Sequence, residues 1–181
     1  PSDASAGGAK HRMRSLLAEA RKEPMAVWYF FCRSAEGQDA TDLSLRFANS
    51  PEEEDNLFQY DIGTSQLVSR PFVFANACST SEADPYITNR LEVNFIRSLG
   101  CRSFLGTEAK VPIVLASRFA VLFFHFFFRR VDGDPVSAGE ALAQARLFLW
   151  TRYRNIGGLF YCLINKFDVF MADEGEIQAL A

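Results

Sequence analysis

Residues 71–78 read PFVFANAC, an apolar run that ends in a cysteine and is followed by small polar residues. The run lacks the alternation of a half-exposed strand, which is typical of a strand buried on both faces of a parallel sheet. Met25 to Cys32 (MAVWYFFC) has the same character, and Cys101 to Leu105 is predicted as a third buried strand. Together these segments predict a largely parallel sheet.

Helical segments separate and follow these strands. Spacing and alternation predict five further elements: helices at Thr88 to Leu99, Ile113 to Arg130 and Ser137 to Tyr153, and strands at Leu43 to Phe47 and Leu159 to Ile164. Strands joined by helical crossovers favour a parallel sheet with helices on both faces. The predicted fold class is therefore α/β, a three-layer α/β/α sandwich with a mostly parallel sheet.

The two long helices each carry an apolar stripe that is predicted to face the sheet. In the first helix the stripe is Ala116, Ala120, Phe123 and Phe127, while a second stripe holds Arg118, His125 and Arg129. In the second helix the inward residues are predicted to be Ala141, Leu142, Ala145, Phe148 and Leu149. The position of His125 beside two arginines predicts a solvent-facing or rim-packed structural histidine with no part in catalysis.

Composition limits the class of protein. The chain has 181 residues, 49% of them hydrophobic, and a net charge of −3, so we expect a flexible linker at residues 1–10 and a single domain at 11–181. No run of Lys and Arg is long enough for nucleic-acid binding. Arg118 interrupts the longest apolar stretch, Pro112 to Phe128, which argues against a membrane span. Because residue 1 is Pro, we expect an excised fragment.

The cysteines and the missing motifs argue against several chemistries. Four cysteines, Cys32, Cys78, Cys101 and Cys162, lie far apart without ligand spacing, which predicts neither a metal site nor a disulfide framework. They are interpreted as reduced thiols of a cytoplasmic protein. Neither a GxGxxG nor a P-loop pattern occurs, so no cofactor is expected.

Candidate site residues gather where predicted strands end. Cys32 and Cys78 each close an apolar run, and Glu108 follows the third strand. In parallel sheets ligands bind at the carboxyl ends of strands, so we expect Cys32 and Cys78 to share one rim, with Glu108 as a further rim carboxylate. A buried structural cysteine is the alternative for Cys78. A thiol nucleophile also needs a base, and neither His11 nor His125 is well placed.

The chain resembles the CHAT family of caspase-like cysteine peptidases. The resemblance covers about residues 25–172 and rests on an ordered set of segments: PFVFANACST (71–80), SLGCRSFLGTEAKVP (98–112), a Phe-rich helix, PVSAGEALAQAR (135–146) and LFYCLINKFDVFM (159–171). It implies a caspase-like fold of the clan that includes caspases and separase, with cysteine peptidase activity in intact members. It also implies that the first strand and helix of the full sheet are missing upstream of residue 10.

The resemblance further assigns roles to individual residues. Cys78 matches the nucleophile, and the stretch YFFCRS (29–34) matches the segment that carries the base. There Arg33 stands at the position of the catalytic histidine and Ser34 at that of a glycine. Backbone N–H groups of Ser34 and Cys78 would stabilise the oxyanion. Ser at position 34 is a departure, since Gly can take backbone angles that Ser resists.

Three functional hypotheses follow. The first is a catalytically impaired peptidase that acts as an interaction or regulatory module for a protein or peptide partner, within a larger bacterial protein. The second is an active cysteine endopeptidase that uses Cys78 with an unidentified base. The third is a doubly wound domain that binds a small ligand, in which the rim cysteines are incidental.

Overall fold

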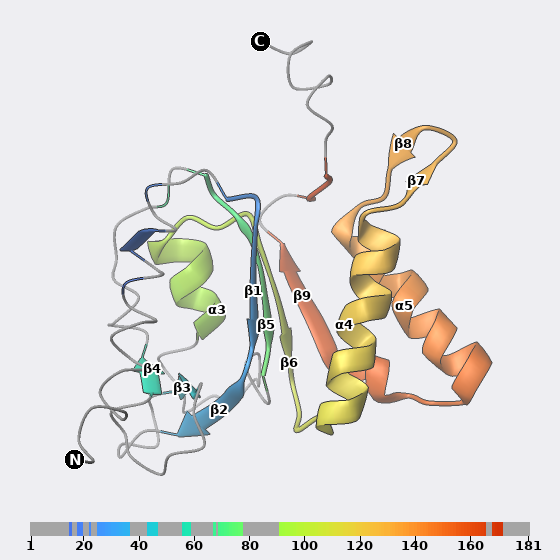
Figure 1. Cartoon of the computed structure of the whole chain (residues 1–181), viewed down its shortest axis with the longest axis horizontal. Coiled ribbons are helices and arrows are strands. Elements are labelled where there is room, and N and C mark those ends of the chain that lie inside the picture. Colours follow the sequence, from blue (N-terminus) through green and yellow to red (C-terminus); the bar gives the residue numbers. More distant parts are fainter. Residues whose placement is uncertain are drawn as a thin grey trace, which may run out of the picture.

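A computed structural model gives the three-dimensional structure of the chain (Figure 1). It describes residues 25–36, 43–46, 56–58, 67, 69–77, 91–165 and 168–171, and residues 15, 18, 19 and 22. For 33–36, 43–46 and 56–58 it describes the backbone alone. His11, Cys78 and the start of the predicted helix at 88–90 lie outside the described residues.

The central sheet of the described chain has four strands in the order β1-β5-β6-β9. These strands are β1 (Val27–Phe31), β5 (Phe72–Asn76), β6 (Ser103–Thr107) and β9 (Tyr161–Asn165). β5 pairs in parallel with both β1 and β6, whereas β9 pairs antiparallel with β6. A mostly parallel sheet in an α/β fold is thus confirmed. The last strand runs antiparallel because two helices, rather than one, connect it to β6.

Burial differs between the inner strands and β1. Every residue of β5 and β6 is buried, as predicted for both strands. In β1 only Trp28 and Phe30 are buried, while Tyr29 and Phe31 are 41% and 44% exposed. The prediction that this run is buried on both faces is wrong, because β1 lies at the edge of the described sheet and is incompletely covered on one side.

Helices lie on both faces of the sheet (Figure 1). α4 (Ile113–Phe127) and α5 (Ala138–Tyr153) pack on one face, in a core that includes Phe72, Phe74 and Leu105. The short α3 (Leu91–Val93) continues into a π-helical turn, η2 (Asn94–Ser98), on the other face. The alternating side chains of β5 therefore enter two different cores.

The predicted helical stripes are largely confirmed. Ala116, Ala120, Phe123 and Phe127 of α4 are buried. In α5 the residues Ala141, Leu142, Ala145 and Leu149 are buried. The prediction that Phe148 faces inward is wrong, since it is 37% exposed. Its ring instead lies near Phe126 of α4, with ring centres 6.4 Å apart, and lines a hollow between α4 and α5.

Local signals in the sequence explain the ends of these helices. Ser137 caps α5, and its hydroxyl accepts a hydrogen bond from the Glu140 N–H while the Glu140 carboxylate accepts one from the Ser137 N–H. Between the helices, β7 (Arg130–Val131) and β8 (Asp134–Pro135) form a small hairpin. Its two turn residues, Asp132 and Gly133, both have positive φ, as a tight hairpin turn requires.

Two of the predicted strands begin later in the chain than expected. β6 begins at Ser103 because the Cys101 N–H still donates to the Phe95 carbonyl and closes the preceding helix. β9 begins at Tyr161 because Gly157–Phe160 forms a 3-10 turn, η3. The strand predicted at Leu43 to Phe47 is present as β3 (Leu43–Arg46).

A second sheet follows β1 directly. β3 pairs antiparallel with both β2 (Arg33–Glu36) and β4 (Asn56–Phe58). Arg33 and Ser34 therefore begin a strand and lie opposite Arg46 and Leu45. This segment enters a strand ladder one residue after Cys32, and the oxyanion role of the Ser34 N–H stays a prediction.

Candidate functional site

The carboxyl ends of β1 and β5 lie side by side. In their parallel register Phe31 is opposite Asn76, so Cys32 and Ala77 follow at the same end of the sheet. Cys78 is the next residue in the chain and lies outside the described residues. The predicted adjacency of the two strands is confirmed, while the distance between the two cysteines stays a prediction.

A buried asparagine ties this rim together. Asn76 is 2% exposed, and its Nδ2 donates to the Tyr29 hydroxyl at 3.1 Å and to the Ala116 carbonyl at 2.9 Å. Its Oδ1 accepts from the Tyr161 hydroxyl at 2.9 Å. One side chain thus links β5 to β1, α4 and β9. Because buried polar groups are costly unless they are hydrogen-bonded, the network fixes the end of β5.

The two tyrosines of the network differ in environment. Tyr161 is fully buried and stacks on Phe119, with ring centres 3.6 Å apart. Tyr29 is partly exposed, and burial raises its pKa although its hydrogen bond with Asn76 acts in the opposite direction. Tyr29 is therefore a neutral phenol at pH 7 and is not available as a base.

A second hydrogen bond holds the residue that precedes Cys78. The hydroxyl of Thr107, which is 1% exposed, donates to the Ala77 carbonyl at 2.5 Å. Thr107 is the last residue of β6, so the bond crosses from one strand end to the next. Asn76 and Thr107 together brace the two residues that lead into the predicted nucleophile.

Glu108 lies at the end of β6 but is associated with another cysteine. It is exposed, and its backbone N–H donates to the Phe160 carbonyl at 2.8 Å. Burial raises the pKa of Cys162, and hydrogen bonding with Glu108 raises it further. Cys162 is therefore a protonated thiol and is not activated. The structure brings Glu108 to Cys162 of the antiparallel strand.

The structure describes the surroundings of three further residues that the sequence analysis considered, namely Cys101, Cys32 and His125. Cys101 is fully buried, and burial raises its pKa to about 12, as expected for a structural thiol. Cys32 is half-buried. His125 is exposed, as its helical position predicts, and its absence from catalysis stays a prediction. The side chains of Arg33 and Ser34 lie outside the described residues.

Asn76, Thr107 and Tyr161 are the site residues that sequence reasoning missed. Asn76 is the one strongly polar residue within the apolar run 72–77, which indicates a buried side chain with partners. The partners were not predictable, because Tyr161 is 85 positions away in the sequence.

Metal and membrane functions gain no support from the described part of the chain. There, His, Cys, Asp and Glu do not gather in groups of three or more that could hold a metal ion. None of the described helices has the length and apolar character needed to cross a membrane.

The chain is similar in sequence to a protein named as a probable protease. No protein-family profile matches the chain. A curated relative from Vitiosangium sp. (strain GDMCC 1.1324), named a probable protease, is 30% identical over 161 residues. The match covers 86% of this chain but 20% of the relative, so the chain spans about a fifth of that protein's length. The similarity is compatible with a peptidase-like domain.

Proposed function

We propose that this chain is a caspase-like peptidase domain of the CHAT type, a three-layer α/β/α sandwich in which Cys78 keeps the nucleophile position but Arg33 replaces the base. The observation that carries the proposal is the braced end of β5. Asn76 and Thr107 fix the backbone immediately before Cys78, and catalysis depends on holding a nucleophile in a defined position. The similarity to a probable protease supports the same class.

The chemistry of Arg33 predicts an incomplete catalytic cycle. Attack of a thiolate on a peptide carbonyl forms a tetrahedral intermediate, and its collapse requires a proton on the departing amine. A guanidinium stays protonated in proteins and cannot accept and return that proton. Its charge can still favour the thiolate of Cys78. The module therefore reacts with electrophiles but hydrolyses peptides poorly, and it binds a protein or peptide partner at the rim.

Restoring the histidine tests this proposal. Wild type, Arg33→His, and Arg33→His with Cys78→Ala are incubated with a mixed peptide library, and products are identified by mass spectrometry. We expect Arg33→His to gain cleavage that the double variant loses, because general base catalysis contributes about 10²- to 10⁴-fold. In parallel, wild type should be alkylated at Cys78 by iodoacetamide at pH 7, and Cys162→Ser should be alkylated equally.

A second function, an active cysteine endopeptidase with a base that is not Arg33, is favoured by the relative's name, a probable protease. The same experiment separates the two. If wild type already cleaves peptides and Cys78→Ala abolishes the cleavage, the impaired-peptidase proposal is wrong. If neither wild type nor Arg33→His cleaves and Cys78 resists alkylation, the nucleophile assignment is wrong as well.

A further inference from the structure

A groove runs along the outer side of the helix pair. α4 and α5 pack against each other, and between them lies a hollow of about 690 Å³. Both helices contribute large apolar side chains to its walls. The lining residues used below are Val114, Arg118 and Val121 of α4, and Phe148 and Tyr153 of α5.

α4 exposes two valines on the side that faces away from the sheet, beside polar residues such as Arg118. Each residue advances a helix by about 100°, so Val114 and Val121 lie roughly opposite the buried Ala116 and Phe123. They are 63% and 70% exposed. A surface helix normally keeps polar residues on this side. The outer valines therefore indicate a face that a partner covers.

α5 shows the same pattern more strongly. Residues 147–150 read LFLW, and four successive residues cover the whole circumference of a helix. Only Leu149 is buried, while Leu147 and Trp150 are 61% and 46% exposed. Exposed apolar side chains that lie next to one another mark interaction sites, and Phe148 of this turn lines the groove.

Charge on this surface has one sign. Arg118 lines the groove, and none of the described residues that line it carries a carboxylate. No ion pair or hydrogen bond joins Arg118 to an acidic side chain in the part of the chain that the structure describes. Exposed Arg152 and Arg154 follow at the end of α5. A partner that carries carboxylates would complement this surface.

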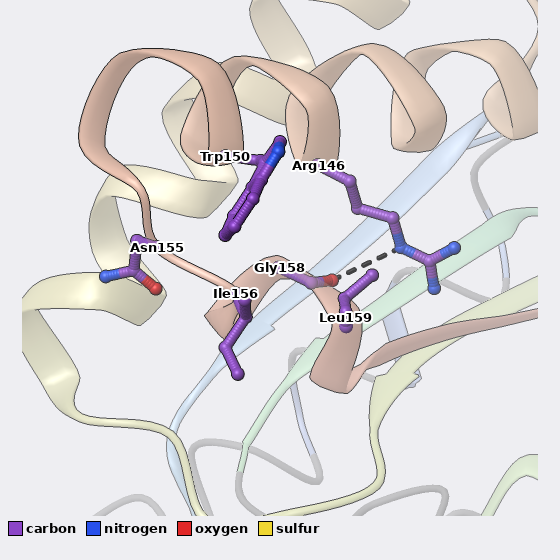
Figure 2. A pocket seen from close by; sticks show the side chains of 6 residues that line it. All are labelled: Arg146, Trp150, Asn155, Ile156, Gly158 and Leu159. Atoms are coloured by element: carbon purple, nitrogen blue, oxygen red, sulfur yellow. Dashed lines mark hydrogen bonds between the residues drawn. The ribbon is translucent and has the colours of Figure 1, made fainter.

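A second hollow, of about 240 Å³, lies beside α5 (Figure 2) and shares the lining residue Asn155 with the groove. Trp150, Ile156 and Leu159 lie around it, and Arg146 crosses its edge. The Arg146 guanidinium donates to the carbonyls of Gly158 and Tyr161, so it holds the η3 turn within this chain. Arg118, in contrast, is not engaged by an acidic residue of the described chain and is the cation suited to a partner.

We propose that the groove between α4 and α5 docks an acidic amphipathic helix of a partner protein. The apolar stripe of that helix packs between Val121 and Phe148, and a carboxylate beside the stripe pairs with Arg118. A third helix fits such a seam at the usual 8–10 Å spacing between helix axes, with anchors at i, i+3/i+4 and i+7. The site is separate from Cys78 and does not depend on the proposed peptidase function.

Two synthetic helical peptides of about 18 residues test the proposal, both with one leucine stripe at i, i+3/i+4 and i+7. One peptide carries Glu beside the stripe and the other carries Lys. Binding to the whole chain is measured by fluorescence anisotropy at low salt. We expect the Glu peptide to bind about tenfold more tightly than the Lys peptide, because Arg118 attracts the carboxylates of the first and repels the ammonium groups of the second.

Variants locate the site and its charge. Val121→Glu should weaken binding of the Glu peptide by at least about tenfold, since the substitution places a carboxylate in the apolar seam. Arg118→Glu should reverse the preference in favour of the Lys peptide. Val131→Glu is the matched control, because Val131 is 46% exposed on β7 and outside the groove, and it should leave both affinities unchanged. Equal melting temperatures confirm that the variants fold.

Several outcomes would overturn the proposal. An unchanged preference in Arg118→Glu would show that charge at the groove does not select the partner. Equal effects of Val121→Glu and Val131→Glu would place binding elsewhere. A dimer in sedimentation that Val121→Glu dissociates would identify a second copy of this chain as the occupant. Binding to anionic vesicles that Val121→Glu abolishes would identify a membrane surface instead.

Discussion

The two faces of α4 contrast sharply although they belong to one helix. The inner face holds fully buried phenylalanines, and its Ala116 carbonyl accepts the hydrogen bond of Asn76. The outer face carries Val114 and Val121, which are more than 60% exposed. Hydrophobic residues on the inner face stabilise the fold by leaving water. The same residue class on the outer face contributes little to folding, which is why it is informative about binding.

The two faces of α4 should differ most in how much the protein loses stability when a side chain is truncated to alanine. Phe123 is fully buried and its ring packs near Phe72 and Phe74, so Phe123→Ala should lower the free energy of unfolding by about 3–5 kcal/mol. Val121→Ala, two positions away on the outer face, should change it by less than about 0.5 kcal/mol. Urea denaturation measures both. Similar losses for the two variants would contradict the assignment of the faces.

The polar network of the inner face should have an intermediate effect. Asn76→Ala removes three hydrogen bonds that link β5 to β1, α4 and β9, at a cost of about 1–3 kcal/mol. It should also slow the alkylation of Cys78, because the strand end before the thiol loses its bracing. Ser117→Ala is a suitable control, since that hydroxyl is exposed and bonds within its own helix. A variant as stable and as reactive as wild type would show that the network is not a positioning device.

The thiol of Cys101, on the opposite face of the sheet from α4, should make the stability of the protein depend on pH. Burial raises the pKa of Cys101 to about 12, above the ordinary value of about 8.5 in an unfolded chain. The unfolded chain therefore releases this proton first as pH rises. The stability that the buried thiol contributes is complete below about pH 8.5 and is lost as pH approaches 12.

We expect the free energy of unfolding to fall between pH 9 and pH 11 by up to about 1.4 kcal/mol per pH unit from this group. Cys101→Ala should show a shallower decline, which urea denaturation across that pH range would measure. Ser117→Ala, which changes no titratable group, is the control and should retain the full slope. Identical slopes in wild type and Cys101→Ala would rule out Cys101 as the source.

The predicted core and the structure agree where local pattern is sufficient. Local pattern alone predicts the uninterrupted buried run of β5. It also predicts the buried stripe of α4, which consists of Ala116, Ala120, Phe123 and Phe127. Phe148 was misassigned because helical phasing gives the direction of a side chain but not the element that faces it. The exposure of Tyr29 and Phe31 is not predictable for a related reason, since this run is apolar on both sides and its pattern does not show that the strand lies at an edge.

The candidate site also combines residues that the sequence predicts with residues that only the structure reveals. The sequence placed Cys78 at a strand end and Arg33 in the position of the base through a family resemblance, and both roles stay predictions. The bracing of that strand end by Thr107 and Tyr161 came from the structure, because these residues meet Asn76 and Ala77 only after strand pairing.

The sequence by itself determined the buried run of β5, the buried stripe of α4 and the bounds of α5, because burial periodicity and capping act over a few neighbouring residues. Only the tertiary structure decided that β9 runs antiparallel, that Asn76 has three partners on three elements, and that an apolar groove with Arg118 stays open between α4 and α5. These features arise from contacts between residues that are distant in the chain, and no local pattern specifies which distant residue will face a given side chain.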